Sequence, residues 1–144
     1  MTLSTHTITV YNKYTVMGSA PFFAESTKWA RAVIRGVYWE DSTNRNVTAD
    51  GLSSIDKTVS IIIPKEADAG DKIFINPKDY TNLNANVCWT LGLEDIIVKG
   101  VCNEDITDSY TEQDLKKDYK SVDIKGYDDN MDTIHLPHFD VRGK

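Results

Sequence analysis

Short runs of alternating apolar and polar residues, rich in β-branched and aromatic side chains, recur along this 144-residue chain. Residues 7–11 place Ile8 and Val10 on one face of a strand, and residues 58–63 form a second run that stops at Pro64. Residues 29–39 are partly apolar on both faces, which indicates a strand covered on two sides. A period of two does not fit a helix, so the pattern favours a mainly β fold.

Turn-forming residues separate further short strands, which we expect at residues 72–75, 87–91, 95–101, 121–127 and 133–141. The pair 87–91 and 95–101 reads as a hairpin, and residues 128–130 read as the turn of the last one. The best helix candidate is residues 111–119, where Thr111 is the N-cap and Asp114 completes a capping box. Asn76 and Pro77 start a shorter helical turn. We therefore predict a single domain over residues 1–144, a small β-barrel or sandwich of about seven or eight short strands with one or two short helices.

Residues 41–57 lack a convincing periodic pattern. They begin with a polar stretch and contain the turn signal Ala49-Asp50-Gly51. We expect a long loop here. Loops of more than about 12–15 residues are uncommon in compact domains and are usually functional or disordered. This segment is therefore the most informative irregular stretch of the chain.

The formal net charge is −6, with 22 acidic and 16 basic residues and no basic stripe. This balance argues against sequence-specific nucleic-acid binding, which normally uses clustered Lys and Arg. The first ten residues do not have the pattern of a secretory signal, and no apolar run approaches the length of a membrane span. Cys88 and Cys102 do not make a disulfide framework, and we expect both to be free thiols in a reducing cytoplasm.

No segment carries a recognisable catalytic or metal-binding motif. Residues 128–132 match the opening of a calcium loop, but Thr133 and Phe139 occupy the positions that require Gly and a carboxylate. His135 and His138 would point to opposite faces of a strand. P-loop, dinucleotide-binding and nucleophile-elbow patterns are absent from the sequence. We therefore expect no metal, no cofactor and no enzymatic activity.

The aromatic residues Trp29, Trp39 and Trp89, together with Tyr38, suggest a different function. Such rings can form a platform for sugars, as in a carbohydrate-binding β-sandwich. They lie within or beside apolar runs, so packing in the core is the favoured interpretation.

Several short motifs give the chain a resemblance to a known family. The strand at residues 33–39 ends in Gly-Val-Tyr-Trp-Glu-Asp, residues 92–100 form a glycine-bounded turn and strand, and the chain closes on His-Phe-Asp-Val-Arg-Gly-Lys. In order and spacing it resembles the small head-closure proteins of long-tailed bacteriophages, also called stoppers or head–tail joining proteins. More closely, it resembles uncharacterised minor capsid proteins encoded among the phage head–tail genes of Gram-positive gut bacteria. The segment at residues 77–87 is an addition relative to shorter members.

The resemblance implies a small β-barrel with a short helix, made in the bacterial host cytoplasm and located in the virion neck. Copies would form a ring, of six or twelve, below the portal and adaptor proteins and above the tail terminator or tail tube. The family's channel loop corresponds to residues 42–54 here, with Asn44, Arg45, Asn46, Asp50 and Gly51 as the residues that face packaged DNA, without sequence-specific binding. A tail terminator or another neck protein is the alternative within this class.

Overall fold

The computed structural model describes residues 5–21, 23–51 and 53–144, without the side chains of residues 44, 46 and 53–56. Eight strands run in the order β1 (His6–Met17), β2 (Glu25–Val47), β3 (Ser53–Pro64), β4 (Ile73–Phe74), β5 (Cys88–Trp89), β6 (Ile96–Lys99), β7 (Ser121–Asn130) and β8 (His138–Gly143). A 3₁₀ turn, η1 (Pro77–Asp79), follows β4, and the helix α1 (Glu112–Asp118) precedes β7. The expectation of a mainly β protein with short helices is confirmed.

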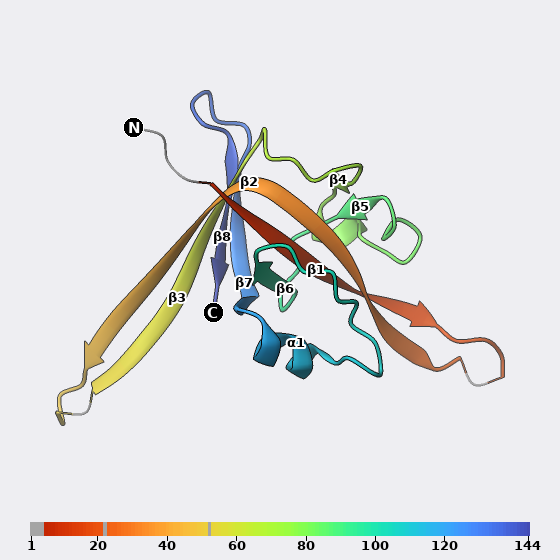
Figure 1. Cartoon of the computed structure of the whole chain (residues 1–144), viewed down its shortest axis with the longest axis horizontal. Helices are drawn as coiled ribbons and strands as arrows, with labels where there is room; N and C mark the ends of the chain where they lie inside the picture. The colour runs from red at the N-terminus through yellow and green to blue at the C-terminus, as the bar shows by residue number, and fades with distance from the viewer. Residues whose placement is uncertain (1–4, 22, 52) are drawn as a thin grey trace.

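Six of the strands close into a barrel in the order β1-β2-β3-β8-β7-β6, while β4 and β5 form a separate small sheet (Figure 1). Every neighbouring pair around the barrel is antiparallel. A closed sheet leaves no unpaired edge around its wall. Of the two predicted architectures, barrel or sandwich, the chain therefore adopts the barrel.

Strand β2 is 23 residues long and belongs to both halves of the barrel. Its first half pairs with β1 and its second half pairs with β3. The change occurs at Gly36, where His6 lies opposite Val37 and Thr7 lies opposite Arg35, so Gly36 forms a bulge. Its φ of 85° is in the left-handed region, which glycine adopts without a steric cost. A bulge bends a strand and increases its twist, and here it lets one strand serve both halves of the barrel.

The barrel interior is filled by alternate residues of its strands, as the period of two requires. Ile8 and Val10 point inward as predicted, and they pack in one buried cluster with Trp39, Ile61 and Val141. The opposite face of β1 and β6 packs in a second cluster, which contains Tyr11, Ile96, Val98, Cys102 and Leu115. Strand β6 is therefore covered on both faces, which explains its continuous apolar run.

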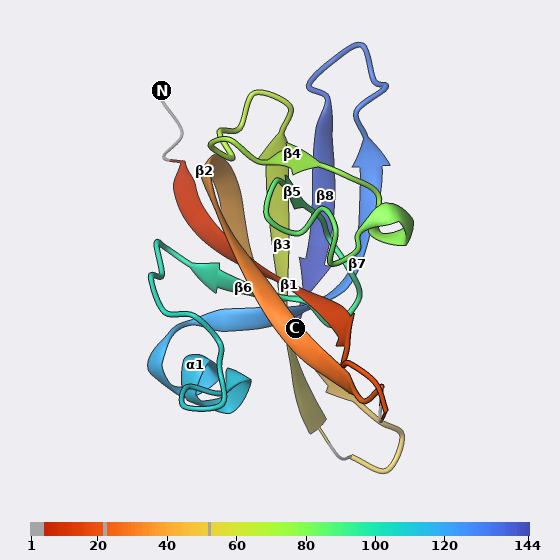
Figure 2. The ribbon, with the colours of Figure 1, turned by 90° about the vertical axis from the view of Figure 1, so that its right-hand side faces the viewer.

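The helix α1 covers this outer face, and it forms where the capping pattern predicts. The Thr111 hydroxyl accepts from the Asp114 amide at 3.3 Å, and the Asp114 carboxylate accepts from the Thr111 amide at 3.0 Å. Leu115 is fully buried, and Tyr119 packs beside it. In Figures 1 and 2 the helix lies on one side of the barrel and the β4–β5 segment lies on the other.

The predicted hairpin of residues 87–91 with 95–101 is wrong. Strand β5 pairs in parallel with β4, whereas β6 lies in the barrel wall between β1 and β7. Parallel pairing joins segments that are distant in sequence, so no local turn signal announces it. Cys102 is buried, Cys88 is partly buried, and both are free thiols. The predicted turn at residues 128–130 belongs to β7, and residues 131–137 connect β7 to β8.

Two hairpins extend from the barrel to opposite sides (Figure 1). Strand β1 pairs with β6 over Ile8–Tyr11 only, and its remaining residues pair with β2 alone. Likewise, β3 pairs with β8 from Val59 onward, and the residues before it pair with β2 alone. We call residues 13–29 the β1–β2 arm and residues 40–58 the β2–β3 arm. Within the described part of the chain, no helix has the length and apolar character needed to cross a membrane.

Candidate interaction site on the β2–β3 arm

The segment expected to be a long loop, residues 41–57, is a regular hairpin over most of its length. Its register runs from Asp41 opposite Val59 to Val47 opposite Ser53, which leaves residues 48–52 as the connection. The expectation of an irregular loop is therefore corrected. A strand shows alternation when one face is buried and the other is exposed. The described side chains of residues 40–57 are all exposed, so they form no buried face that would impose that pattern.

The five predicted site residues divide between the strand and its turn. Asn44, Arg45 and Asn46 lie in β2, opposite Asp56, Ile55 and Ser54. The Arg45 side chain is exposed, while the side chains of Asn44 and Asn46 lie outside the part of the chain that the structure describes. Asp50 and Gly51 lie in the turn at the end of the arm. All five therefore belong to one projecting element.

The turn itself is closed by local hydrogen bonds. The Gly51 amide donates to the Thr48 carbonyl at 3.0 Å, and the Thr48 hydroxyl donates to the Asp50 carboxylate. Gly51 has a φ of 83°, which explains the glycine at this position. Val47 beside the turn is 70% exposed. Among its described residues, the end of the arm thus presents polar turn residues next to the apolar side chain of Val47.

Three residues that are not among the five predicted site residues fix the base of this arm. The Trp39 ring is buried in the barrel, and its Nε1 donates to Asp41 Oδ1 at 3.3 Å. Lys120 Nζ lies 2.8 Å from Asp41 Oδ2 and 5.9 Å from the centre of the Trp39 ring. The hydrogen bond from Lys120 lowers the pKa of the Asp41 carboxyl below its ordinary value. Lys120 is 79 residues away in sequence, so no local motif indicates the contact.

Positive charge gathers around the base of the arm, although the whole chain is acidic. A hollow of about 420 Å³ lies between the arm and the end of β7, and Lys57, Lys120 and Lys144 line it together with Asp41. A neighbouring hollow adds Lys125 and Arg142. Lys120, Lys125 and Arg142 form ion pairs with Asp41, Glu94 and Asp128, respectively. The base is therefore a mixed-charge surface in which cations are concentrated.

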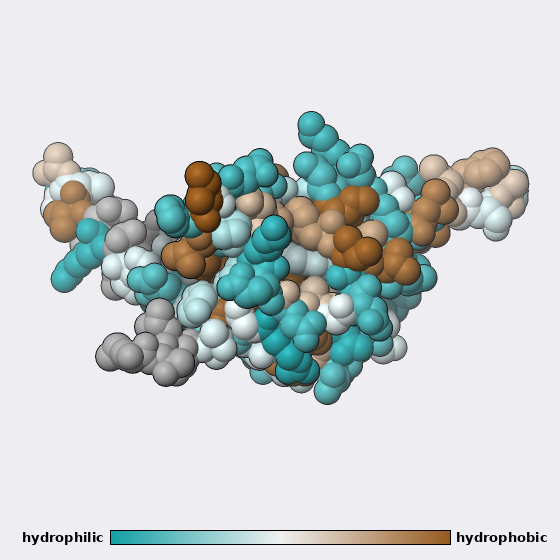
Figure 3. Space-filling view, turned by 90° about the horizontal axis from the view of Figure 1, so that it is seen from above, coloured by the Kyte–Doolittle hydropathy of each residue, from teal (hydrophilic) through white to brown (hydrophobic). Residues whose placement is uncertain are grey.

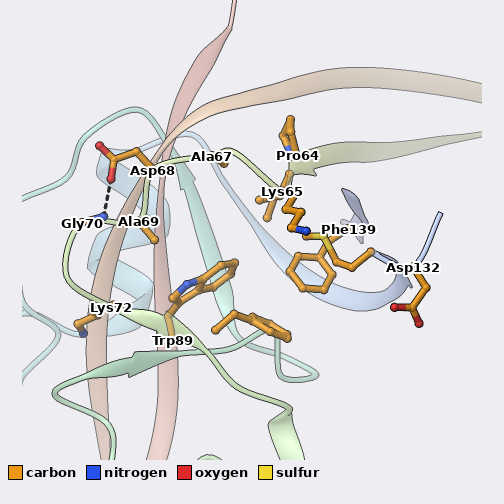
Figure 4. A pocket seen from close by; sticks show the side chains of 13 residues that line it. Pro64, Lys65, Ala67, Asp68, Ala69, Gly70, Lys72, Trp89, Asp132 and Phe139 are labelled. Carbon is orange, nitrogen blue, oxygen red and sulfur yellow. Dashed lines mark hydrogen bonds between the residues drawn. The ribbon is translucent and has the colours of Figure 1, made fainter. Parts of the chain in front are cut away.

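A hollow of about 550 Å³ lies at the end of the barrel next to β4 and β5 (Figure 4). Trp89 and Phe139 form its floor, and Asp68 accepts from the Gly70 amide at 2.8 Å on its rim. Lys72 Nζ donates to the carbonyl of Arg31 at 2.9 Å, and burial lowers the pKa of this ammonium. The residues that line the hollow include no Ser, Cys or His, so they offer no nucleophile–base pair of the usual kind.

A buried polar network lies in the barrel wall, and its role is structural. The Asp95 carboxylate accepts from Asn12 Nδ2 at 2.9 Å, from the Lys13 amide at 3.1 Å and from the Gly92 amide at 3.0 Å. Asn12 Nδ2 also donates to the Thr90 carbonyl at 2.7 Å. Burial raises the pKa of Asp95 to about 6, although these donors act in the opposite direction. The carboxylate joins the turn before β6 to β1.

The residues considered for metal binding do not assemble into a site. Among the described residues, no three His, Cys, Asp or Glu side chains are grouped so that they could hold an ion. His138 Nδ1 lies 2.6 Å from the Leu136 carbonyl and donates to it. Met131 donates its amide to Asp129 Oδ1 at 3.0 Å, which is the contact of an ordinary acidic turn.

The fold defines the class of protein: a small closed β-barrel with two projecting hairpins. The chain belongs to a family of unknown function, DUF6751, whose profile matches residues 2–144. No curated protein and no solved structure matches the chain.

Proposed function

We propose that this protein is a structural component of the neck of a tailed phage virion. In this proposal, copies form a ring below the portal and adaptor, close the DNA channel after packaging and provide the surface on which the tail docks. The sequence resemblance to head-closure proteins suggests the role. The observation that carries the proposal is the β2–β3 arm, an exposed hairpin in the chain position of the family's channel loop.

The arm supplies the parts that such a closure needs. Beyond Trp39 and Val59, none of its described side chains is buried, so the hairpin does not serve the barrel's own packing. A two-stranded ribbon alone in water is only marginally stable, and contact with other molecules would hold it in one position. Several such arms converging on a ring axis would obstruct the end of the DNA. A later contact with the tail would then move them aside.

The charge of the protein fits a channel that DNA can pass through. The net charge of −6 repels the phosphate backbone over most of the surface, which disfavours tight and sequence-specific binding. The mixed-charge surface at the base of the β2–β3 arm includes Lys57, Lys120 and Lys144, which could contact phosphates near the end of the packaged DNA. A tail terminator would share the acidic balance and the ring, and it is the alternative within this class.

A carbohydrate-binding module is the alternative from another class, and the positions of the tryptophans argue against it. Trp39 and Trp89 are 7% and 5% exposed, so neither ring has a free face for a sugar. Trp29 is half-buried, and its ring lies 5.8 Å from Lys13 Nζ. These rings pack in the protein and do not form an open platform.

The first experiment is to measure the copy number of this chain in purified virions of the encoding phage, by quantitative mass spectrometry against the portal protein. We expect six or twelve copies per particle. The absence of the chain from particles would overturn the proposal. A second test shortens the β2–β3 arm by replacing residues 44–56 with Asn-Gly, which joins the paired residues Thr43 and Lys57. Particles assembled with this variant should lose packaged DNA, and unchanged retention would refute the role of the arm.

A further inference from the structure

Three described residues other than glycine have a left-handed backbone: Phe23, Glu94 and Leu136, with φ of 45°, 67° and 51°. This conformation is unfavourable for bulky side chains. Two of the three are also exposed apolar residues, since Phe23 is 57% exposed and Leu136 is 82% exposed. At these two positions both the backbone conformation and the exposure of an apolar side chain are unfavourable for folding. Strained residues of this kind cluster at functional sites.

Phe23 lies at the end of the β1–β2 arm, in a defined turn. The Gly18 amide donates to the Ala24 carbonyl at 2.8 Å and closes the connection between the strands. A Cβ added to Gly18 would lie 2.8 Å from the same oxygen, so the turn requires glycine. Met17 next to it is also 57% exposed. The arm therefore ends in an apolar tip formed by Met17 and Phe23.

Leu136 lies beside a groove on the barrel. The groove has a volume of about 440 Å³, and mainly apolar side chains line it: Tyr38, Ile62, Pro64, Leu136 and Pro137, with Glu66 and His138 at its polar edge. Its size suits one large side chain and part of a second. Figure 3 views the face of the molecule that is uppermost in Figure 1, where apolar side chains gather between the arms and also near the arm ends.

We propose that the apolar tip of the β1–β2 arm in one copy of this chain docks in the Leu136 groove of a second copy. The arm points away from the barrel, and the β7–β8 connection that carries Leu136 lies on another side, so the tip does not reach its own groove (Figure 1). A contact between two different surfaces is head-to-tail, and repeating it with the correct rotation closes a ring.

Charge also favours a second copy as the occupant. Residues 126–138 at the groove contain three aspartates and no lysine or arginine. Residues 13–28 of the arm contain two lysines, Lys13 and Lys28, and one acidic residue, Glu25. Both lysines lie at the barrel end of the arm, where Lys13 is opposite Trp29 and Lys28 is opposite Tyr14, whereas Glu25 is opposite Met17 at the tip. The barrel end of the arm is therefore cationic, and the β7–β8 connection beside the groove stays acidic although Arg142 pairs with Asp128. This difference favours approach of the arm to the groove side of another copy over approach to another arm.

The small area of the contact determines the protein concentration at which it would form. One arm tip buries much less than the roughly 1,000 Å² that a stable interface needs. Dilute copies should therefore stay separate, and docking should require a high local concentration, such as a platform that collects several copies. The inference thus deepens the proposed ring and rests on it for its biological setting. The contact itself can be tested without a virion.

The test uses two proteins, Phe23→Cys and Leu136→Cys, each also carrying Cys88→Ala because Cys88 is the partly exposed native thiol. We expect a short bismaleimide to cross-link the mixture of the two into dimers, and the Phe23→Cys/Leu136→Cys double variant into a ladder. Val47→Cys is the matched control for the arm, and Leu83→Cys is the control for the groove, since both positions are exposed and apolar. Equal yields from the controls, or no dimers from the mixture, would overturn the inference.

A second measurement uses Phe23→Asn, because asparagine tolerates the left-handed backbone and removes the ring. Sedimentation at high protein concentration should show self-association that is about tenfold or more weaker in this variant, as expected when a buried Phe side chain is lost. Unchanged association would contradict the contact. The two proposals can fail separately. If the variants cross-link but the chain is absent from virions, only the neck role is refuted. If the chain is present in virions but the variants do not cross-link, only the docking is refuted.

Discussion

The side-chain amide of Asn12 donates a 2.9 Å hydrogen bond to the carboxylate of Asp95, and both residues are buried although they are 83 positions apart in sequence. The bond ties β1 to the turn that precedes β6. A buried carboxylate of this kind makes the stability of the barrel depend on pH.

The folded pKa of Asp95, about 6, is above the ordinary value of 3.8, so the folded protein holds this proton more tightly than the unfolded chain. The contribution of Asp95 to stability is therefore present below about pH 4 and is lost as pH rises through 6. Its full size is roughly 3 kcal/mol. We expect Asp95→Asn to remove this pH dependence. The new side-chain amide would also face hydrogen-bond donors, which should lower the free energy of unfolding by about 1–3 kcal/mol at every pH. Urea unfolding at pH 4.5 and 7.5 measures both effects. If the free energies of unfolding of the wild type and the variant differ by the same amount at the two pH values, the predicted pH dependence is contradicted.

Gly36 should resist substitution because of its backbone alone. Apart from Gly36 and its two chain neighbours, no residue has an atom within 4 Å of a Cβ added there, so crowding is not the reason, but its φ of 85° disfavours side chains. We expect Gly36→Val to lower the free energy of unfolding by about 1–2 kcal/mol or more. Gly36→Asn, which tolerates the left-handed region, is the matched control and should cost less. Equal losses in denaturant unfolding would mean that something other than φ makes glycine necessary.

The capping box of α1 should be measurable in the stability of the whole barrel, because the helix covers the outer face of β1 and β6. Thr111→Ala removes the hydroxyl that accepts from the Asp114 amide, and we expect a loss of about 1 kcal/mol. Thr111→Ser keeps that hydroxyl and should lose little. A thermal or urea unfolding curve distinguishes the two variants. Identical curves would show that the cap does not support the helix in this context.

The β2–β3 arm should be separable from the fold. Replacing residues 44–56 with Asn-Gly removes no described side chain that is buried, so we expect a change of less than about 1 kcal/mol in the free energy of unfolding. Trp39→Ala, at the base of the same arm, should instead cost about 3–5 kcal/mol because it leaves a cavity in the barrel. A large loss in the shortened variant would show that the arm supports the barrel, and DNA leakage could then no longer be attributed to the arm itself.

Tryptophan fluorescence tests the carbohydrate alternative. Trp39 and Trp89 are almost completely buried, so the native protein should emit at short wavelength and lose that shift in urea. Adding glycans should leave the emission unchanged. Saturable quenching by a glycan would show an accessible ring and would favour the sugar-binding module over the structural role.

Features that depend on local chemistry were predictable from the sequence. The cap at Thr111, the Asn76-Pro77 turn and the inward face of Ile8 and Val10 each follow from residues that are close together in the chain. The base of the β2–β3 arm was not predictable, because Lys120 and Asp41 are distant in sequence and come into contact only in the tertiary structure. The parallel pairing of β4 with β5 was not predictable either, because no local turn signal marks it.

The arm itself shows a different limit of sequence reasoning. Its strands read as a loop because pattern recognition detects the burial of one face, and the described side chains of residues 40–57 include none that is buried. The sequence did mark the segment as unusual, and it identified the turn at Asp50 and Gly51. It did not show that the preceding residues extend the same strand that holds Trp39.

That shared strand limits how sequences of this kind can change. Strand β2 sets the register of both arms and of the barrel wall between them, and a one-residue insertion within it would turn every following side chain to the opposite face. Insertions at the connections, residues 18–24 and 48–52, would change no register. Within residues 6–64, we therefore expect length variation in this family to be confined to the two tips, while the number of residues between the tips stays constant.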